Sequence, residues 1–171
     1  MIHIEKAGEG SIPVIQELAK ITWPVTYGAI LSAEQLDYMM ALIYSTESLQ
    51  QQMRKGHQFI LAIEDDKPVG FASYSVKDAA VSPTLYRLHK LYVDPSQQGK
   101  GTGRILLNHI VAEIIFLGAT ALELNVNRHN KARQFYEKLG FEVVGEEDID
   151  IGNGYFMNDY IMQADLTAGL F

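Results

Sequence analysis

Residues 93–104 have the sequence Val93-Asp94-Pro95-Ser96-Gln97-Gln98-Gly99-Lys100-Gly101-Thr102-Gly103-Arg104, a glycine-rich turn between two apolar segments. The preceding segment is strand-like, with apolar side chains at Leu88, Leu91 and Val93. The following apolar side chains recur at helical spacing until Gly118, at Leu106, Leu107, Ile110, Val111, Ile114 and Ile115. The glycines therefore lie at a helix N-terminus, where N–H groups lack intrahelical partners and the helix dipole is positive. This arrangement predicts a backbone cradle, meaning a set of main-chain N–H groups that binds a phosphate. Glycine allows the phosphate to come close to the backbone because it has no Cβ.

Two common phosphate-binding patterns do not fit this turn. A P-loop needs a glycine five residues before its Gly-Lys pair and a Ser or Thr after it, whereas Asp94 and Gly101 hold those positions. A dinucleotide-binding fingerprint needs a third glycine where the chain has Leu106. Neither class of nucleotide site is therefore predicted.

The turn instead fits the pattern Gln-x-x-Gly-x-Gly, read as Gln98, Gly101 and Gly103. Between a strand and a helix, this pattern resembles the Arg/Gln-x-x-Gly-x-Gly/Ala signature of the GNAT superfamily of N-acetyltransferases. The resemblance implies that the turn binds the pyrophosphate of acetyl-CoA, whereas an ordinary tight turn before a helix is the alternative for this motif alone. The implied cofactor-binding residues are Leu91, Tyr92, Val93, Gln98, Gly99, Lys100, Gly101, Thr102, Gly103 and Arg104.

A second segment, Asn130–Phe141, resembles the other hallmark of this family, an Asn followed by Ala-x-x-Phe-Tyr-x-Lys-x-Gly-Phe. Asn130 can cap a short helix, and Gly140 can end it in the left-handed conformation. The side chains expected to face inward are Ala132, Phe135 and Leu139. Both motifs occur in the family's order, and the likeness extends from Gln58 to Met162.

Strand and helix patterns alternate along the chain without repeats or linkers. The predicted strands are Ile2–Lys6, Gln58–Glu64, Val69–Val76, Leu85–Val93, Ala121–Val126, Phe141–Ile149 and Tyr155–Ala164. Helices are predicted after Ser11 and ending before Pro24, after Ser32, after a cap at Thr46, after the glycine turn and after Asn130. Hairpin turns are predicted at Asp65–Lys67 and Asn153-Gly154. With the resemblance, this order predicts an α/β, GNAT-like fold in one domain over residues 1–171, a mixed, splayed central sheet of about seven strands with about four to five helices.

Composition narrows the classes of partner and of site. The 171 residues are 47% apolar and 20% charged, with a net charge of −7 and no basic stripe, so nucleic acid is not an expected partner. No apolar run is long enough for a membrane span, and the alternating N-terminus does not resemble a secretion signal, so the cytoplasm is the expected location. There is no cysteine, and the five histidines lack metal-ligand spacing, so neither a disulfide nor a metal is predicted.

Acetyl transfer to an amine needs a base, an oxyanion donor and an acid. An alkyl amine has a pKa near 10.4, so only about one molecule in 10³ is neutral at pH 7. The resemblance implies that a backbone N–H near Tyr92 stabilises the oxyanion and that Tyr136 protonates the leaving thiolate. Glu123 and His89 are alternative bases, and the choice between them is open.

The resemblance also implies roles for residues outside the glycine turn. Asn130 and Tyr136 would contact acetyl-CoA. Trp23 and Tyr27 lie where the family forms its acceptor wall, although core packing explains Trp23 equally well. The acidic run 146–150 is either a solvated surface or a field that attracts a cationic acceptor.

The predicted activity is transfer of the acetyl group of acetyl-CoA to a primary amine by direct attack. The acceptor is a small molecule, including a polyamine as in the spermidine/spermine acetyltransferase branch that the chain loosely resembles, or a protein amino group. The alternative is a non-catalytic acyl-CoA-binding or sensing module on the same fold. Acceptor identity, and assembly as a monomer or a homodimer, are open.

Overall fold

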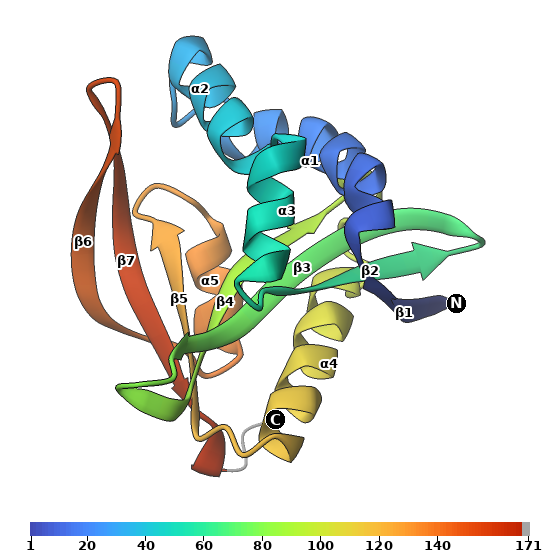
Figure 1. Cartoon of the computed structure of the whole chain (residues 1–171), viewed down its shortest axis with the longest axis vertical. Coiled ribbons are helices and arrows are strands. Elements are labelled where there is room, and N and C mark those ends of the chain that lie inside the picture. Colours follow the sequence, from blue (N-terminus) through green and yellow to red (C-terminus); the bar gives the residue numbers. More distant parts are fainter. Residues whose placement is uncertain (169–171) are drawn as a thin grey trace. The chain divides into compact units, whose positions relative to one another are not determined.

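The computed structural model describes residues 1–168, which form a seven-stranded mixed sheet in the order β1-β2-β3-β4-β5-β7-β6, with five α-helices (Figure 1). The strands are β1 (Ile2–Ala7), β2 (Gln58–Glu64), β3 (Lys67–Asp78), β4 (Ser82–Val93), β5 (Ala121–Asn127), β6 (Glu142–Gly152) and β7 (Tyr155–Asp165). The helices are α1 (Ile12–Tyr27), α2 (Ala33–Tyr44), α3 (Thr46–Arg54), α4 (Thr102–Phe116) and α5 (Ala132–Lys138). The predicted α/β architecture, a mixed sheet of about seven strands with four to five helices, is confirmed.

The chain divides into two compact units. The first comprises Met1–Ser75 and Lys90–Ile110, and the second comprises Val76–His89 and the described residues from Val111 onward. No helix among residues 1–168 is both long enough and apolar enough to cross a membrane.

In the first unit, β1 pairs antiparallel with β2, and β2 pairs antiparallel with β3. The turn between β2 and β3 is formed by Asp65 and Asp66, whose φ angles of 51° and 63° are both left-handed, as a two-residue hairpin requires. Five consecutive residues of β2, Phe59–Ile63, are buried, so side chains cover both faces of this strand. The predicted bounds of β2 and the predicted hairpin are confirmed.

The predicted cap of α2 is confirmed, whereas the predicted cap of α3 is one residue off. The Ser32 hydroxyl accepts a hydrogen bond from the N–H of Gln35 at 3.1 Å, which confirms the predicted cap of α2. At α3 the capping residue is Ser45, which accepts from the N–H of Ser48 at 3.1 Å, and Thr46 is instead the first helical residue. Either hydroxyl could cap a helix, and the backbone places Ser45 in the extended conformation that a cap needs.

The prediction that the first helix ends before Pro24 is wrong, because α1 continues to Tyr27. Proline supplies no N–H to the preceding turn and disfavours a helix interior. However, Trp23 and Tyr27, on either side of the proline, are only 3% and 9% exposed. The N–H of Gly28 also donates to the Pro24 carbonyl at 2.9 Å. Burial of two aromatic rings therefore outweighs one missing hydrogen bond.

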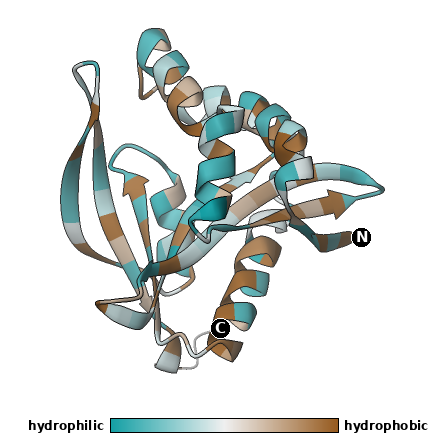
Figure 2. Ribbon diagram, in the orientation of Figure 1, coloured by the Kyte–Doolittle hydropathy of each residue, from teal (hydrophilic) through white to brown (hydrophobic). Residues whose placement is uncertain are grey.

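In the second unit, β4 pairs parallel with β5, and β7 pairs antiparallel with both β5 and β6. The predicted hairpin between β6 and β7 is confirmed, since Asn153 and Gly154 have φ angles of 56° and 80°. In β5 the consecutive residues Leu122–Leu124 are all buried. Helix α4, which contributes to both units, is mostly apolar, whereas α3 is mostly hydrophilic (Figure 2).

A buried ammonium group lies in the first unit. Lys90 of β4 is 9% exposed, and its Nζ donates to Gln52 Oε1 at 2.6 Å. The Nζ also lies 5.8 Å from the ring centre of Tyr44 and 5.5 Å from that of Phe59. Burial lowers the pKa of Lys90 from 10.5 to about 8.

Replacing Lys90 with Met is expected to stabilise the fold at neutral pH. Between pH 10.5 and about 8 the unfolded chain binds the Lys90 proton and the folded chain does not, so wild-type stability falls as pH decreases through this window. The difference amounts to about 3 kcal/mol at ~1.4 kcal/mol per pH unit, and the Met variant lacks this loss.

Urea unfolding below pH 8 and above pH 10.5 tests this expectation. The advantage of Lys90→Met over the wild type should shrink as pH rises, whereas Lys55→Met, at an exposed lysine, should differ little from the wild type at either pH. A stability difference for Lys90→Met that does not change with pH would contradict the argument.

Candidate functional site

The glycine-rich turn forms an open set of backbone donors at the start of α4. Gly99 and Gly101 have φ angles of 81° and 76°, which favour glycine. The first bond of α4 runs from the N–H of Ile105 to the Gly101 carbonyl at 3.0 Å. Within residues 1–168, the four N–H groups of residues 101–104 donate to no acceptor. A Cβ placed on Gly101 would meet no atom within 4 Å, so the space beside this residue is open. This geometry suits an anion.

A buried glutamine, which sequence reasoning missed, links this turn to β2. Gln97 is 5% exposed, and its Nε2 donates to Glu64 Oε1 at 3.1 Å. Its Oε1 accepts from the hydroxyl of Thr102, the first residue of α4, at 3.1 Å. Lys100 Nζ lies 3.6 Å from the same Glu64 oxygen. The hydrogen bond from Gln97 is the main cause that lowers the pKa of Glu64.

The end of β4 packs closely against β3 and α4. A Cβ on Gly70 of β3 would lie 3.1 Å from the Tyr92 carbonyl oxygen and 3.3 Å from Leu106 Cδ1. Just after β4, the N–H of Asp94 donates to the Val69 carbonyl at 2.8 Å. Glycine at position 70 therefore permits the close approach that fixes the strand end before the turn.

An aromatic cluster brings together three of the residues singled out from the sequence. Trp23 and Tyr27 have ring centres 4.6 Å apart, and the Tyr27 hydroxyl lies 2.9 Å from the hydroxyl of Tyr92. The indole N–H of Trp23 donates to the Tyr44 hydroxyl at 2.9 Å, and burial raises the pKa of Tyr44. Trp23 therefore has a packing role, and its predicted contact with an acceptor stays a prediction.

In the second unit, the predicted Asn130 cap differs in position, because the N-cap residue of α5 is Lys131 and Asn130 closes the turn just before it. Asn130 Oδ1 accepts from the N–H of Ala132 at 2.9 Å. Tyr136 is 7% exposed, and its ring centre lies 5.5 Å from that of Phe141 and 5.2 Å from that of Phe135. The inward-facing prediction for Phe135 is only partly correct, because Phe135 is half-buried and Tyr136 is the more buried ring.

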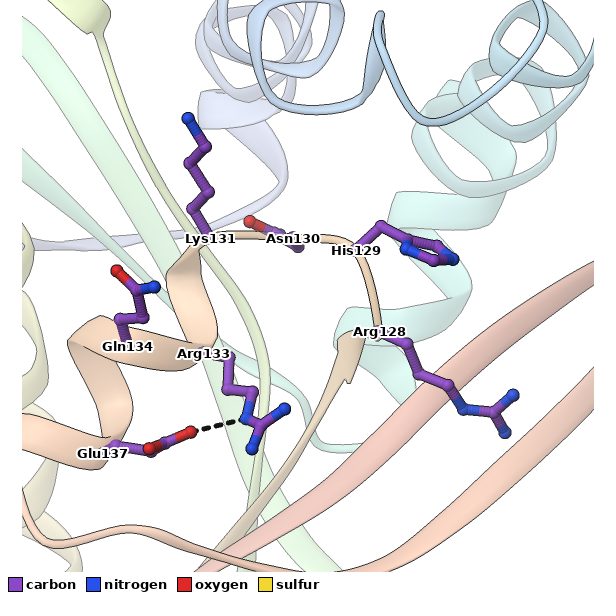
Figure 3. Close-up of a pocket in the computed structure, with 7 residues that line it drawn as sticks. All are labelled: Arg128, His129, Asn130, Lys131, Arg133, Gln134 and Glu137. Atoms are coloured by element: carbon purple, nitrogen blue, oxygen red, sulfur yellow. Dashed lines mark hydrogen bonds and ion pairs between the residues drawn. The ribbon is translucent and has the colours of Figure 1, made fainter.

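A cationic pocket of about 350 Å³ lies around the start of α5 (Figure 3). Its lining residues are Arg128, His129, Asn130, Lys131, Arg133, Gln134 and Glu137. Arg133 forms an ion pair with Glu137 and lies 4.6 Å from the ring centre of Tyr160. Arg128 forms an ion pair with Asp148, with 2.9 Å between the guanidinium nitrogen and Oδ1. Basic residues thus surround the Asn130 motif at close sequence spacing, a signal that the sequence reasoning did not use. The lining suits an anionic group.

Glu123, a candidate base, is buried beside a lysine. Glu123 of β5 is 5% exposed, and Lys77 Nζ lies 2.7 Å from its Oε2. Arg87 of β4 is directly opposite Glu123 in the parallel pairing. His89 lies farther along β4 and is half-buried. The structure therefore places both candidates within the second unit, and the choice between them stays open.

A second buried carboxylate was not identified from the sequence. Asp159 of β7 is 1% exposed and accepts from Asn125 Nδ2 at 3.3 Å. Burial raises the pKa of Asp159, and the charges of Arg87 and Arg128 act in the opposite direction. The pairing of β5 with β7 places Asn127 opposite Asp159, so Glu123, Asn125 and Asp159 share one face of the sheet.

Metal ligation has no visible basis in the described part of the chain. Among residues 1–168, no group of three or more His, Asp or Glu side chains could hold a metal ion. The two units thus offer backbone donors, a cationic pocket, a buried tyrosine and buried carboxylates.

Comparison with known proteins gives one consistent family. A family model described as acetyltransferase (GNAT) domain matches residues 30–157. The peptidyl-lysine N-acetyltransferase YjaB of Escherichia coli is 35% identical over 54% of this chain, which spans 54% of that protein. The spermidine N(1)-acetyltransferase of Thermoplasma acidophilum is 29% identical over 91% of this chain and 95% of its own. The chain therefore spans about half the length of YjaB but nearly all of the Thermoplasma relative.

Solved structures agree with this family. The PaiA N-acetyltransferase from Thermoplasma acidophilum, crystallised in complex with coenzyme A, has a TM-score of 0.81 and 26% identity, over 96% of this chain and 99% of its own. The ribosomal-protein-S18-alanine N-acetyltransferase from Escherichia coli has a TM-score of 0.72 at 20% identity, over 97% of this chain and 94% of its own, and shares the fold.

Proposed function

The chain belongs to the GNAT acetyltransferase family, and we propose that it transfers the acetyl group of acetyl-CoA to a primary amine. The observation that carries this proposal is the set of four N–H groups at residues 101–104, which donate to no acceptor within residues 1–168. Pyrophosphate oxygens are strong acceptors, and a helix N-terminus stabilises negative charge. The complex of PaiA with coenzyme A supports the same cofactor.

The proposed reaction is a direct acyl transfer. The alkyl ammonium first loses a proton to a base, and the neutral nitrogen attacks the thioester carbon to form a tetrahedral oxyanion. The C–S bond then breaks, the nitrogen loses a second proton, and the thiolate takes a proton to give coenzyme A and an N-acetylated product. Tyr136 is the proposed proton donor, because a phenol with a pKa near 10 suits a thiolate.

Glu123 is one proposed acceptor of the amine proton, and His89 is the alternative. Burial of Glu123 supports a role in a water-poor site, although the Lys77 ammonium competes for the same carboxylate. A backbone N–H at Leu91, Tyr92 or Val93 is the proposed oxyanion donor. Trp23 and Tyr27 stay proposed acceptor contacts.

We propose an alkyl ammonium compound, including a polyamine, as the acceptor. Peptidyl-lysine and spermidine, named for two relatives, both present primary alkyl amines. The buried carboxylates of Glu123 and Asp159 lie on one sheet face, and the net charge is −7, so a cation is favoured. A cytoplasmic location stays a prediction from the sequence, and assembly as a monomer or a homodimer stays open.

An acceptor panel tests the activity and its charge preference. Thiol release from acetyl-CoA should be faster with spermidine than with a hydroxyl-bearing monoamine of similar length, and added salt should reduce the advantage because it screens steering. A lysine peptide separates protein from small-molecule acceptors. Equal, salt-insensitive rates would contradict a preference for a polycationic acceptor. Coenzyme A binding, without release of thiol from acetyl-CoA in the presence of any amine, would favour a binding module.

Replacing Gly101 with Val should weaken coenzyme A binding at least tenfold, because a branched side chain would cover the donors. Gly56→Val is the matched control, since Gly56 lies outside the turn and likewise has a left-handed φ angle, 99°, with open space at the Cβ position. Both variants thus incur similar backbone strain of about 1–2 kcal/mol. Calorimetry on folded protein should show the larger loss at Gly101, and equal affinities would argue against the cradle.

Tyr136→Phe should slow acetyl transfer while preserving coenzyme A affinity. The variant keeps the ring that packs against Phe141 and removes only the hydroxyl. General acid catalysis contributes about 10²- to 10⁴-fold, so the single-turnover rate should fall by this amount. Tyr86→Phe, at another buried tyrosine, should leave the rate unchanged. A wild-type rate for Tyr136→Phe would leave water as the proton donor.

A further inference from the structure

We propose that Gln97 is a positioning residue that holds the four N–H donors of the turn in place before the cofactor binds. The proposal rests on the proposed function, because it takes the ligand to be the pyrophosphate of coenzyme A. It adds a residue that lies outside the Gln-x-x-Gly-x-Gly pattern, one position before Gln98.

The side-chain amide of Gln97 links β2 to α4. Its Nε2 donates to Glu64, the last residue of β2, and its Oε1 accepts from Thr102, the first residue of α4, each at 3.1 Å. An amide can do both at once, whereas a carboxylate cannot donate to Glu64 and an apolar side chain can do neither. Gln97 and Thr102 are 5% and 1% exposed, so water competes little for the bond between them.

The turn needs such a constraint because its own backbone restricts its conformation only weakly. Gly99 and Gly101 have wide conformational freedom, and a Cβ at either would meet no atom within 4 Å, so few neighbours restrain them. The N–H groups that would bind the ligand cannot also be tied to protein acceptors. Fixing Thr102 through its hydroxyl leaves its N–H free and still sets its direction. Such preorganisation lowers the ordering cost that binding would otherwise incur.

Glu64 has two partners that substitutions can separate. Lys100 Nζ lies 3.6 Å from Glu64 Oε1, but the lysine side chain is 53% exposed, so this pair is weak. Glu64→Gln keeps an oxygen that can accept from Gln97 and removes the charge that attracts Lys100. Glu64→Leu removes both interactions. Positioning through Gln97 therefore predicts near wild-type coenzyme A affinity for Glu64→Gln and a loss for Glu64→Leu.

A double-mutant cycle on full-length protein tests the proposal, with calorimetry of coenzyme A and thermal unfolding of each variant. Gln97→Leu and Thr102→Val should each weaken binding about tenfold, and the double variant should be little worse than either, because both remove the same hydrogen bond. Thr102→Ser keeps the hydroxyl and should restore affinity. The KM for acetyl-CoA should rise, with kcat at saturation unchanged, as expected when only binding geometry is lost.

The outcomes separate this proposal from the function on which it rests. A folded Gln97→Leu protein with wild-type affinity, or losses that simply add in the double variant, would overturn the positioning role. If Gln97→Leu does not fold, Thr102→Val against Thr102→Ser decides the same question, and equal affinities there would overturn it. Failure of the wild-type protein to bind coenzyme A would instead overturn the proposed function, whereas wild-type binding that only Gly101→Val weakens would leave that function standing.

Discussion

The start of α4 must leave four backbone N–H groups without a protein partner and yet hold them still. Folded chains rarely leave such donors unpaired when they are buried, and the first turn of a helix is a place where regular structure produces them. The rest of the first unit can be understood from this requirement. Leu106, Leu107 and Ile110 are fully buried and fix the body of the helix, Gly70 lets β3 approach the end of β4, and Gln97 fixes the turn from inside. An apolar core thus supports one open polar site.

Local sequence signals predicted the fold well because they act over a few residues. The bounds of β2, the Asp65-Asp66 turn and the Ser32 cap follow from alternation, left-handed backbone and a hydroxyl beside a helix start, and each was confirmed. The glycine turn before α4 was predicted for the same reason. The error at Pro24 arose where tertiary burial of Trp23 and Tyr27 overrode a local rule.

The sequence predicted less of the site, because its remaining polar contacts join distant residues. Gln97 and Glu64 are 33 positions apart, and Asn125 and Asp159 are 34 apart, so neither pair has a spacing that a motif could reveal. Both pairs depend on how strands are ordered and registered, which hydrophobic periodicity leaves undetermined. Glu123 was identified as a candidate, but its partner Lys77 belongs to a different strand and could not be inferred from β5 alone.

Strand β6 lies at one end of the strand order and is therefore an edge strand. Most residues of β6 are exposed, and they include the apolar Val143 and Val144, which are 39% and 56% exposed. A long edge with such residues is a template for uncontrolled strand addition between molecules. The carboxylates along 146–150 oppose this association, because two copies would bring like charges together. The acidic run thus also protects the protein against aggregation, at a sheet edge whose backbone groups would otherwise pair with those of another molecule.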